Sequence, residues 1–497
     1  MAITFYNSLT RREETFSPLT EGAPVGVYAC GPTVYSDVTI GNWRTYFLTD
    51  AVVRILRAGG YSDHFITNIT DVGHLTGDNL GDADTGEDRL EKAAREHQET
   101  ARDIANRYFE RFKEERRLLN LIDPNEFTRA ADDIYIKAQK QLIETLYKNE
   151  YVYLTSDGLY FDVAKYESKY SDYSVLSGAR AEASHVARID ENPEKKDYRD
   201  FALWKFSPND VQREMEWESP LKEELNIVKK GFPGWHLECS AMSMKHLGEQ
   251  FDIHIGGEDL RQTHHPNEIA QSQAATGKTP FVKYWLHSAF LLVDGGKMGK
   301  SLGNAYTLTD IQERGIDPMA LRYLFSQTHY RKQLNFTWEA LRAAETALHR
   351  LYAHVAELYS TVGDSRHSVE AGSDSYGYFI DAVCGDVNIS AGLAELSILL
   401  GYSDTQMGAA QKLKTVLKMD EVLGFNIKER MKTFLPIPLD DLPDDICDSI
   451  HKRATARAEK RWSDADALRD DLAVRGYSVS DTNEGQEVRR RVDNTMA

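Results

Sequence analysis

Three short apolar runs, each rich in β-favouring residues and closed by glycine, constrain the fold of this 497-residue chain most strongly. They are VGVYAC at 25–30, FDIHIGG at 251–257 and WLHSAFLLV at 285–293. A continuous apolar run of this length is typical of a strand buried on both faces of a parallel sheet. Because more than 200 residues separate the first run from the other two, the sequence predicts one sheet split by an insertion.

The first run leads into a glycine-bearing loop and then a helix. The loop spans 33–42, and a helix is predicted from Trp43 because Phe47, Ala51 and Ile55 recur at helical spacing. In such a strand–loop–helix unit, the helix N-terminus offers free N–H groups and a positive dipole end to phosphate. The usual glycine-rich fingerprints are absent, so this unit alone does not establish a nucleotide-binding domain.

A second glycine-flanked loop, DGGKMGKSLGN at 294–304, directly follows the run at 285–293. This lysine loop carries Lys297 and Lys300. Loops of this composition are usually solvated surface, but one at the carboxyl end of a parallel strand can close over phosphates.

The segment 231–268 gathers residues that bind metals. If it turns helical at His264, then His264 and Glu268 project from one face and can reach a single ion, while His265 points elsewhere. The distance in sequence from Cys239 does not match the close-set pairs of zinc fingers. A structural interpretation therefore stays open, with Cys239 as a buried small hydrophobe and the histidines at a helix cap. Three further histidines near the motifs are assigned to polar loops or packing: His74, His236 and His254.

The rest of the chain predicts an inserted domain and a helical C-terminal region. A hairpin is predicted to turn at Asp157–Gly158, and Thr309 and Gln312 are predicted to form a capping box. From Asn335 strand signals nearly vanish, and a last module from about Ser449 is predicted as a helix pair followed by a short extended piece. The predicted fold class is α/β, a split Rossmann-like nucleotide-binding domain with an inserted domain, followed by an α-helical C-terminal region.

Charge and cysteine content limit the possible partners and the cellular compartment of the protein. A net charge of −19 argues against coating by nucleic acid through bulk charge, but it leaves room for docking on local basic patches. After position 449 there are ten basic and nine acidic residues, and this near-neutral tail favours an RNA-facing end. Four widely spaced cysteines fit a reducing cytoplasm. The sequence contains no run of about 18 apolar residues, so it predicts no membrane-spanning helix.

As an ordered set, six motifs resemble those of the cysteinyl-tRNA synthetase family. They are ACGPTVY…TIGN, NITDV, PGWHLECSAM, GGEDL…HHPNEIAQ, KMGKSLGN and the terminal ADALRDDLAVRGYSVSDT, and together they span nearly the whole chain. The resemblance implies a class I aminoacyl-tRNA synthetase that activates L-cysteine with ATP and Mg²⁺ and passes it to tRNA(Cys). It also implies a cytoplasmic monomer without membrane attachment.

By this resemblance Cys30 joins Cys239, His264 and Glu268 around one zinc ion that takes the substrate thiolate. A thiolate is a far better zinc ligand than a serine hydroxyl, which is hard to ionise at neutral pH. Such a metal can reject serine by several orders of magnitude, so the resemblance implies no separate editing domain.

The resemblance also implies roles along the nucleotide and amino-acid pockets. Lys297 and Lys300 supply positive charge to the phosphates, and Lys300 is expected to contact ATP. Thr39 and Asn42 belong to the same catalytic set, where the Thr39 hydroxyl can donate a hydrogen bond but cannot carry charge. The other implied contacts are Gly41, Asn42, Gly257 and Asp259 for ATP, and Thr70 and Trp235 for the amino acid.

The same resemblance suggests domain boundaries. The two halves of the catalytic domain are placed at 1–125 and 231–305, with an inserted connective segment at 126–230 between them. A stem-contact segment follows at 306–345, then a helical tRNA-binding domain at 346–448 and a small C-terminal module at 449–497.

Three departures from the family pattern stand out. Thr39 occupies the position where the family usually has histidine, and the loss of charge there is expected to reduce phosphate stabilisation by roughly 1–3 kcal/mol. Gly299 replaces the usual serine between the lysines, and Leu221 to Lys229 look like an insertion.

Two alternatives remain. One is a zinc-dependent ligase that passes cysteine to an amino-sugar, although the long region after 335 exceeds what a small acceptor needs. The other is a catalytically silent synthetase relative, which Thr39 alone supports.

Overall fold

The computed structural model describes residues 2–73, 75, 88–170, 173–177, 192–208, 213–299, 302–362, 370–403, 405–482 and 485–491. The chain divides into two compact units. The first unit comprises Met1–Asp310, Thr328–Phe336 and Val383–Ile389, and the second comprises Ile311–Gln327, Thr337–Ala382 and Ser390–Ala497.

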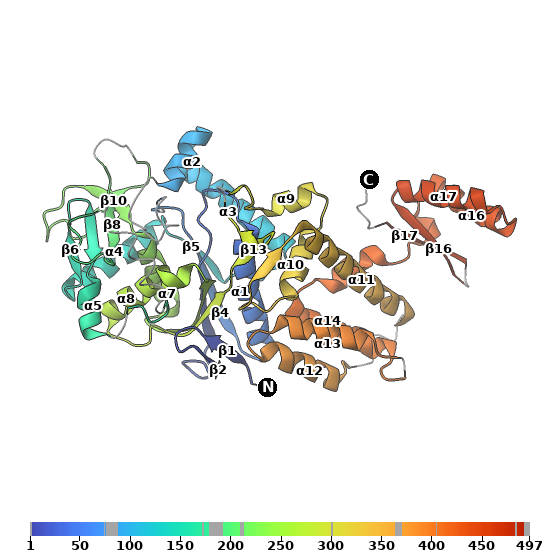
Figure 1. The fold of residues 1–497 in the computed structure, drawn as a ribbon, viewed down its shortest axis with the longest axis horizontal. Coiled ribbons are helices and arrows are strands. Elements are labelled where there is room, and N and C mark those ends of the chain that lie inside the picture. Colours follow the sequence, from blue (N-terminus) through green and yellow to red (C-terminus); the bar gives the residue numbers. More distant parts are fainter. Residues whose placement is uncertain are drawn as a thin grey trace. The chain divides into compact units, whose positions relative to one another are not determined.

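The centre of the first unit is a parallel sheet with the strand order β12-β11-β3-β4-β5 (Figure 1). Its strands are β3 (Val25–Ala29), β4 (Asp63–Ile69), β5 (Glu126–Arg129), β11 (Phe251–Gly257) and β12 (Val282–Ser288). All of β3 and nearly all of β11 are buried, which explains why both appear in the sequence as unbroken apolar runs. Both the α/β class and the split sheet are confirmed, because β11 lies beside β3 although a long insertion separates them.

The predicted run at 285–293 is not one strand. It breaks at Ala289–Phe290, so that its first part ends β12 and its last part forms β13 (Leu291–Val293) in another sheet. That sheet has the order β14-β13-β15, with β14 (Gly296–Lys297) and β15 (Leu334–Phe336), and it carries the start of the lysine loop.

Helices connect and cover the parallel sheet. Helix α1 (Ile40–Ala58) follows β3 and begins three residues before the predicted start, because Ile40 to Asn42 form its first turn. Its predicted apolar stripe of Phe47, Ala51 and Ile55 is buried. Helices α2 (Arg89–His97), α3 (Ala101–Leu118) and α4 (Asp133–Lys148) lead into the insertion, and α7 (Trp235–Leu247) and α8 (His264–Thr276) flank β11 in sequence.

The insertion forms a second sheet with the order β6-β7-β8-β10-β9. Its strands are β6 (Val152–Leu154), β7 (Gly158–Phe161), β8 (Phe201–Phe206), β9 (Trp217–Glu218) and β10 (Lys230–Pro233). Strands β6 and β7 confirm the predicted hairpin. Leu159 and Trp204 of this sheet share a buried core with Leu237 of α7 and Ala270 of α8, so the insertion packs against the helices that carry the candidate metal ligands. Short α5 (Val163–Lys169) and an N-terminal hairpin, β1 (Thr4–Asn7) and β2 (Arg12–Thr15), complete the unit.

The second unit is mainly helical, as predicted. Its described helices include α10 (Pro318–Ser326), α11 (Trp338–Val362), α12 (Ser373–Cys384), α13 (Ile389–Leu400), α14 (Ala409–Leu423) and α15 (Ile427–Arg430). At the C-terminus, α16 (Asp444–Ala458) and α17 (Trp462–Val474) precede a hairpin of β16 (Tyr477–Thr482) and β17 (Gly485–Arg490). No helix within the described ranges is both long and apolar enough to cross a membrane.

The predicted capping box at Thr309 and Gln312 is wrong by two residues. Helix α9 (Leu308–Glu313) is instead capped by Thr307, whose hydroxyl accepts a hydrogen bond from the backbone N–H of Asp310 at 3.3 Å, while the Asp310 carboxylate accepts one from the backbone N–H of Thr307 at 2.7 Å. An acidic residue at the third helical position fits the motif as well as glutamine does.

Candidate active site

Four side chains from distant parts of the sequence converge in the first unit. Cys30 lies directly after β3, Cys239 lies in α7, and His264 and Glu268 begin α8 one helical turn apart. One ligand atom from each can be chosen so that all four lie within 4.8 Å of one another. The cluster is closed to solvent, since Glu268 is 0 % exposed and Cys30, the most accessible member, is 8 % exposed.

The distances within this cluster are short enough for one ion to bridge it. The sulfurs of Cys30 and Cys239 are 3.9 Å apart, and His264 Nε2 lies 3.4 Å from the Cys239 sulfur. His264 Nε2 also lies 3.0 Å from Glu268 Oε1, which in turn is 3.9 Å from the Cys30 sulfur. Sulfur, imidazole nitrogen and carboxylate oxygen together form a donor set typical of a borderline-soft divalent metal.

The residues of the cluster shift one another's pKa values. Burial disfavours the Cys239 thiolate, but the hydrogen bond with Cys30 and the nearby His264 lower the pKa of Cys239 to about 6. Burial likewise disfavours charge on Glu268, yet His254 and His264 lower its pKa to about 2. Burial raises the pKa of the Cys30 thiol, and the adjacent Cys239 raises it further. Burial lowers the pKa of His264, but Cys239 and Glu268 raise it to about 10. Cys239 and Glu268 are therefore ready to bind a cation, whereas Cys30 and His264 must each lose a proton on binding.

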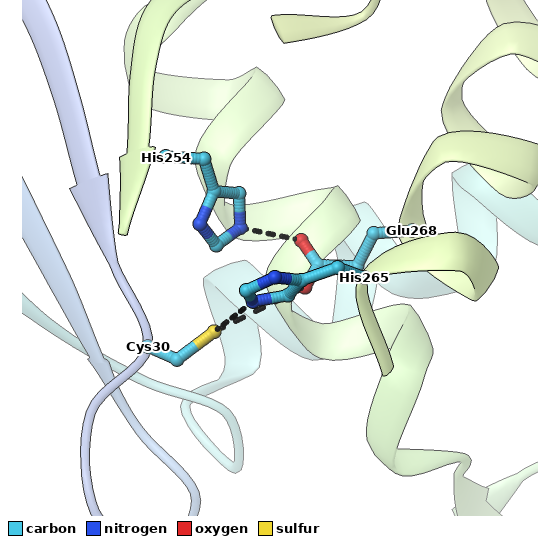
Figure 2. Close-up of side chains that lie close together, drawn as sticks. All are labelled: Cys30, His254, His265 and Glu268. Atoms are coloured by element: carbon cyan, nitrogen blue, oxygen red, sulfur yellow. Dashed lines mark hydrogen bonds and ion pairs between the residues drawn. The ribbon is translucent and has the colours of Figure 1, made fainter. Parts of the chain in front are cut away.

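Two histidines that the sequence assigned elsewhere also reach the cluster. His254 of β11 was predicted to pack, but its Nε2 lies 2.9 Å from Glu268 Oε2. His265 was predicted to point elsewhere, but its Nε2 lies 3.6 Å from the Cys30 sulfur and 3.9 Å from Glu268 Oε1. Figure 2 shows the His254 ring aimed at the Glu268 carboxylate and the His265 ring beside the Cys30 sulfur. The prediction that His265 points elsewhere is wrong, whereas His254 does pack, stacked on Trp285, and contacts Glu268 in addition. Cys30, His254, His265 and Glu268 form a second set that could hold an ion.

The close approach of His265 depends on a glycine. A Cβ atom on Gly256 would lie 2.5 Å from the ring carbon Cε1 of His265. The first glycine of the GGEDL motif therefore makes room for a ring, a role that the sequence could have signalled only through the pairing of β11 with α8.

Further contacts orient the ligands from outside. His236 Nδ1 lies 2.8 Å from His264 Nδ1, on the side of the ring that faces away from the cluster. The Trp235 ring lies over His264, with centroids 4.3 Å apart and planes at 33°. Thr70 is buried and donates a hydrogen bond to Glu238 Oε2 at 2.9 Å. Trp235 thus lies against the cluster, and Thr70 lies on the loop that follows β4.

The predicted nucleotide contacts of α1 lie at its first turn. Thr39 is the N-cap residue, and its hydroxyl donates to Asn42 Oδ1 at 2.7 Å instead of capping the helix. A Cβ atom on Gly41 would lie 2.5 Å from Cε of Met298, so the lysine loop lies directly against the first turn of α1. The structure thus brings together two motifs that are more than 250 residues apart in the sequence.

The remaining predicted contacts lie at the end of β11 and in the lysine loop. A Cβ atom on Gly257 would lie 2.3 Å from Oδ1 of Asp259, so glycine lets this carboxylate fold back on the strand end. Lys297 is exposed and pairs through its backbone with Leu292. Lys300 lies outside the described residues, as does His74.

These features lie together at the carboxyl ends of the strands of the parallel sheet. Cys30 follows the end of β3, and Gly257 ends the neighbouring β11. The chain leaves β3 toward β4 on one side and returns to β11 on the other, so this pair of strands is the topological switch point where open α/β sheets bind ligands.

Comparison with known families decides which α/β enzymes the chain is related to. A family model described as "tRNA synthetases class I (C) catalytic domain" matches residues 15–346, and one described as "Cysteinyl-tRNA ligase anticodon binding domain" matches residues 439–489. The chain belongs to the cysteinyl-tRNA synthetase family.

Several curated members of this family match nearly end to end. Cysteine–tRNA ligase 1 of Burkholderia lata is 44% identical over 489 residues, covering 98% of this chain and 97% of the relative. Cysteine–tRNA ligase of Zymomonas mobilis subsp. mobilis is 36% identical over 516 residues, covering 96% of each. The prediction drawn from the six motifs is thereby confirmed.

Solved structures of other synthetases share the fold. Mycobacterium tuberculosis methionyl-tRNA synthetase in complex with methionyl-adenylate has a TM-score of 0.54 at 15% identity, covering 85% of this chain and 94% of that one. The LeuRS of Agrobacterium radiobacter K84, in a ternary complex with tRNA and LeuAMS, has a TM-score of 0.58 at 12% identity, covering 84% of this chain and 86% of that one. At these identities the likeness shows the class I fold.

Proposed function

We propose that this member of the family is a cysteine–tRNA ligase, which activates L-cysteine with ATP and transfers the cysteinyl group to the 3′ end of tRNA(Cys). One observation carries this function: a class I (C) catalytic domain and a cysteinyl-tRNA ligase anticodon-binding domain occur in one chain whose curated relatives are cysteine–tRNA ligases over almost their whole length.

We assign Cys30, Cys239, His264 and Glu268 as ligands of one zinc ion. Two thiolates that are each about 2.3 Å from a tetrahedral zinc lie about 3.8 Å apart, and the two sulfurs here are 3.9 Å apart. This set offers two soft sulfur donors, whereas the set with His254 and His265 offers one. An ion held by these residues would act as a Lewis acid with a preference for the substrate thiolate over the serine hydroxyl.

The neighbouring histidines hold the ligands in place. His254 donates to the Glu268 oxygen that faces away from the other ligands, and His236 contacts the outer nitrogen of His264. Such outer contacts fix the orientation of the imidazole ring and of the carboxylate. We assign Thr70 and Trp235 to the amino-acid pocket, supported by the position of the Trp235 ring on His264.

We assign ATP to the carboxyl ends of β3 and β11. Thr39 and Asn42 at the first turn of α1 offer hydrogen bonds to phosphate, and Lys297 and Lys300 supply positive charge. Gly41, Gly257 and Asp259 are assigned to the nucleoside, with Mg²⁺ accompanying the phosphates. In this arrangement the cysteine carboxylate attacks the α-phosphorus, pyrophosphate leaves, and the residues act by positioning and by charge.

The tRNA is assigned to the region after the catalytic halves. The match at 439–489 supports an anticodon contact near the predicted module 449–497. We retain 306–345 as a stem-contact segment, 346–448 as a helical tRNA-binding domain, 1–125 and 231–305 as the catalytic halves and 126–230 as the inserted segment. A cytoplasmic monomer also remains part of this proposal.

The decisive experiment pairs two measurements on purified protein. ATP–pyrophosphate exchange that depends on cysteine tests activation, and charging of total tRNA tests transfer. We expect both reactions, with about one zinc per chain by metal analysis. Exchange without charging would favour the amino-sugar ligase, and the absence of exchange at any protein concentration would favour the silent relative.

A further inference from the structure

Arg44 is a buried arginine on α1 that none of the motifs includes. It lies five residues after Thr39 and is 2 % exposed. Burial lowers its pKa to about 10, so the guanidinium stays charged at neutral pH. Among the described residues no carboxylate forms an ion pair with it. A buried charge without a counter-ion is costly and has to be satisfied by hydrogen bonds.

The guanidinium is satisfied by main-chain carbonyls from two segments. Nη1 donates to the carbonyl oxygens of Ala289 at 2.8 Å and Phe290 at 3.0 Å. Nη2 donates to the carbonyl oxygen of His329 at 3.3 Å and also to that of Lys332. Ala289 and Phe290 directly precede β13, and the other two residues shortly precede β15.

Strand β13 leads directly into the lysine loop, and β15 is its parallel partner. Strand β13 pairs with β15 and, through Leu292 and Val293, with β14, which contains Lys297. Arg44 therefore fixes the N-terminal end of the lysine loop, its first root, to α1, which packs beside β13 (Figure 1).

The second root of the loop is fixed to the same helix. The backbone N–H of Ile40 donates to the carbonyl oxygen of Tyr306 at 2.8 Å, and Thr39 forms a β-bridge with Thr307. Between the roots, Asn304 closes the loop by accepting from Gly299 N–H at 2.9 Å and donating to the Lys297 carbonyl at 3.1 Å. The helix that presents Thr39 and Gly41 thus also holds both ends of the loop that presents the lysines.

We propose that Arg44 is a positioning residue for ATP activation, which holds the lysine loop in register with the first turn of α1. This inference rests on the proposed function, because it assumes that the lysine loop and the first turn of α1 both contact the phosphates of ATP. A structural role alone would lower stability without a selective effect on ATP. Misplacing a catalytic group by about 1 Å can cost on the order of 100-fold in rate.

The test compares Arg44→Lys with Arg116→Lys. Lysine keeps the charge but presents a single ammonium, which cannot span carbonyls of both segments. Arg116 is the control, because it is also buried in the first unit and donates to a main-chain carbonyl, that of Ile122, away from the lysine loop. Unlike Arg44 it also pairs with a carboxylate, that of Asp123 at 3.5 Å. For Arg44→Lys we expect cysteine-dependent exchange to fall about 10- to 100-fold in kcat/KM for ATP, with the KM for cysteine and the zinc content unchanged.

A measurement independent of activity completes the test. Hydrogen–deuterium exchange of peptides covering 289–299 should become faster in Arg44→Lys and stay at the wild-type rate in Arg116→Lys. Ser288→Ala provides a milder second variant if Arg44→Lys does not fold. It removes the 2.6 Å hydrogen bond between the hydroxyls of Thr45 on α1 and Ser288, the residue before Ala289. It should show the same selective loss to a smaller extent.

The outcomes separate this inference from the proposed function. An inactive wild-type protein would refute the proposed function. An active wild type whose Arg44→Lys variant matches Arg116→Lys in kinetics and peptide exchange would overturn the role of Arg44. That role would also be overturned if the KM for cysteine or the zinc content changed in parallel with the KM for ATP.

Discussion

The candidate metal cluster and the candidate nucleotide loops share one edge of the parallel sheet but differ in construction. The cluster is buried, its residues come from a strand end and two helices, and each ligand contacts another ligand or an outer histidine. The nucleotide side is half-exposed: Asn42 and Lys297 are exposed, and the contact between the two motifs is made at a glycine. Selection of the amino acid is thus assigned to a rigid region and handling of ATP to an adjustable one.

This contrast has a physical basis. A metal ligand must be held within a few tenths of an ångström, which requires several independent contacts per side chain. A loop that closes over phosphates must also open to release product, which requires few buried contacts. If the contrast is right, substitutions in the metal cluster should leave ATP binding unchanged, and substitutions in the nucleotide loops should leave zinc binding unchanged.

The largest effect is expected from Cys239→Ser, which breaks the rigid side. Loss of a direct ligand should cost more than the roughly 10- to 100-fold in metal affinity that loss of an outer contact costs. We expect zinc content well below one per chain and weaker discrimination against serine in the exchange assay. Cys447→Ser, at a half-exposed cysteine outside the cluster, should retain full zinc. Full zinc and unchanged selectivity in Cys239→Ser would falsify the ligand assignment.

A smaller effect on the same side is expected from His254→Phe. Phenylalanine keeps the ring stacked on Trp285 but removes the 2.9 Å contact to Glu268. Zinc affinity, measured by competition with a chelator, should fall about 10- to 100-fold. His349→Phe, which changes a half-buried histidine in the second unit, should leave zinc affinity at the wild-type value. An unchanged affinity in His254→Phe would show that Glu268 needs no outer support.

The nucleotide side can be broken separately with Gly257→Ala. The added Cβ would lie 2.3 Å from Oδ1 of Asp259 and force that carboxylate away from the strand end. The KM for ATP should rise on the order of 10-fold, while zinc content stays at one per chain. Gly408→Ala is the control, because a Cβ atom there meets nothing within 4 Å. A loss of zinc in Gly257→Ala would mean that the two sides are mechanically coupled.

The smallest effect is expected from Thr39→His. Histidine adds a group that can carry charge beside the phosphates, so exchange should stay the same or rise by about 5-fold, which corresponds to the lower end of the loss of roughly 1–3 kcal/mol expected for threonine. The change also removes the 2.7 Å hydrogen bond to Asn42. A large loss of kcat in the exchange assay would show that the first turn of α1 has been rebuilt around threonine.

Local sequence patterns predicted much of the fold. The apolar runs located β3 and β11, the stripe of Phe47, Ala51 and Ile55 located α1, and the turn at Asp157–Gly158 located a hairpin. These elements are visible in sequence because burial and turn geometry act within a few residues. The run at 285–293 was misjudged because apolarity continues across the break at Ala289–Phe290, where the chain changes sheets.

What the sequence determined by itself is the set of elements, the motif order and the i, i+4 relation of His264 and Glu268. What only the tertiary structure decided is which distant residues meet: Cys30 with Cys239, His254 with Glu268, and Arg44 with the root of the lysine loop. The reason is that these contacts depend on strand order and register in a parallel sheet, which no local periodicity encodes. This holds for partners 209 residues apart, such as Cys30 and Cys239, and for partners 14 residues apart on different elements, such as His254 and Glu268.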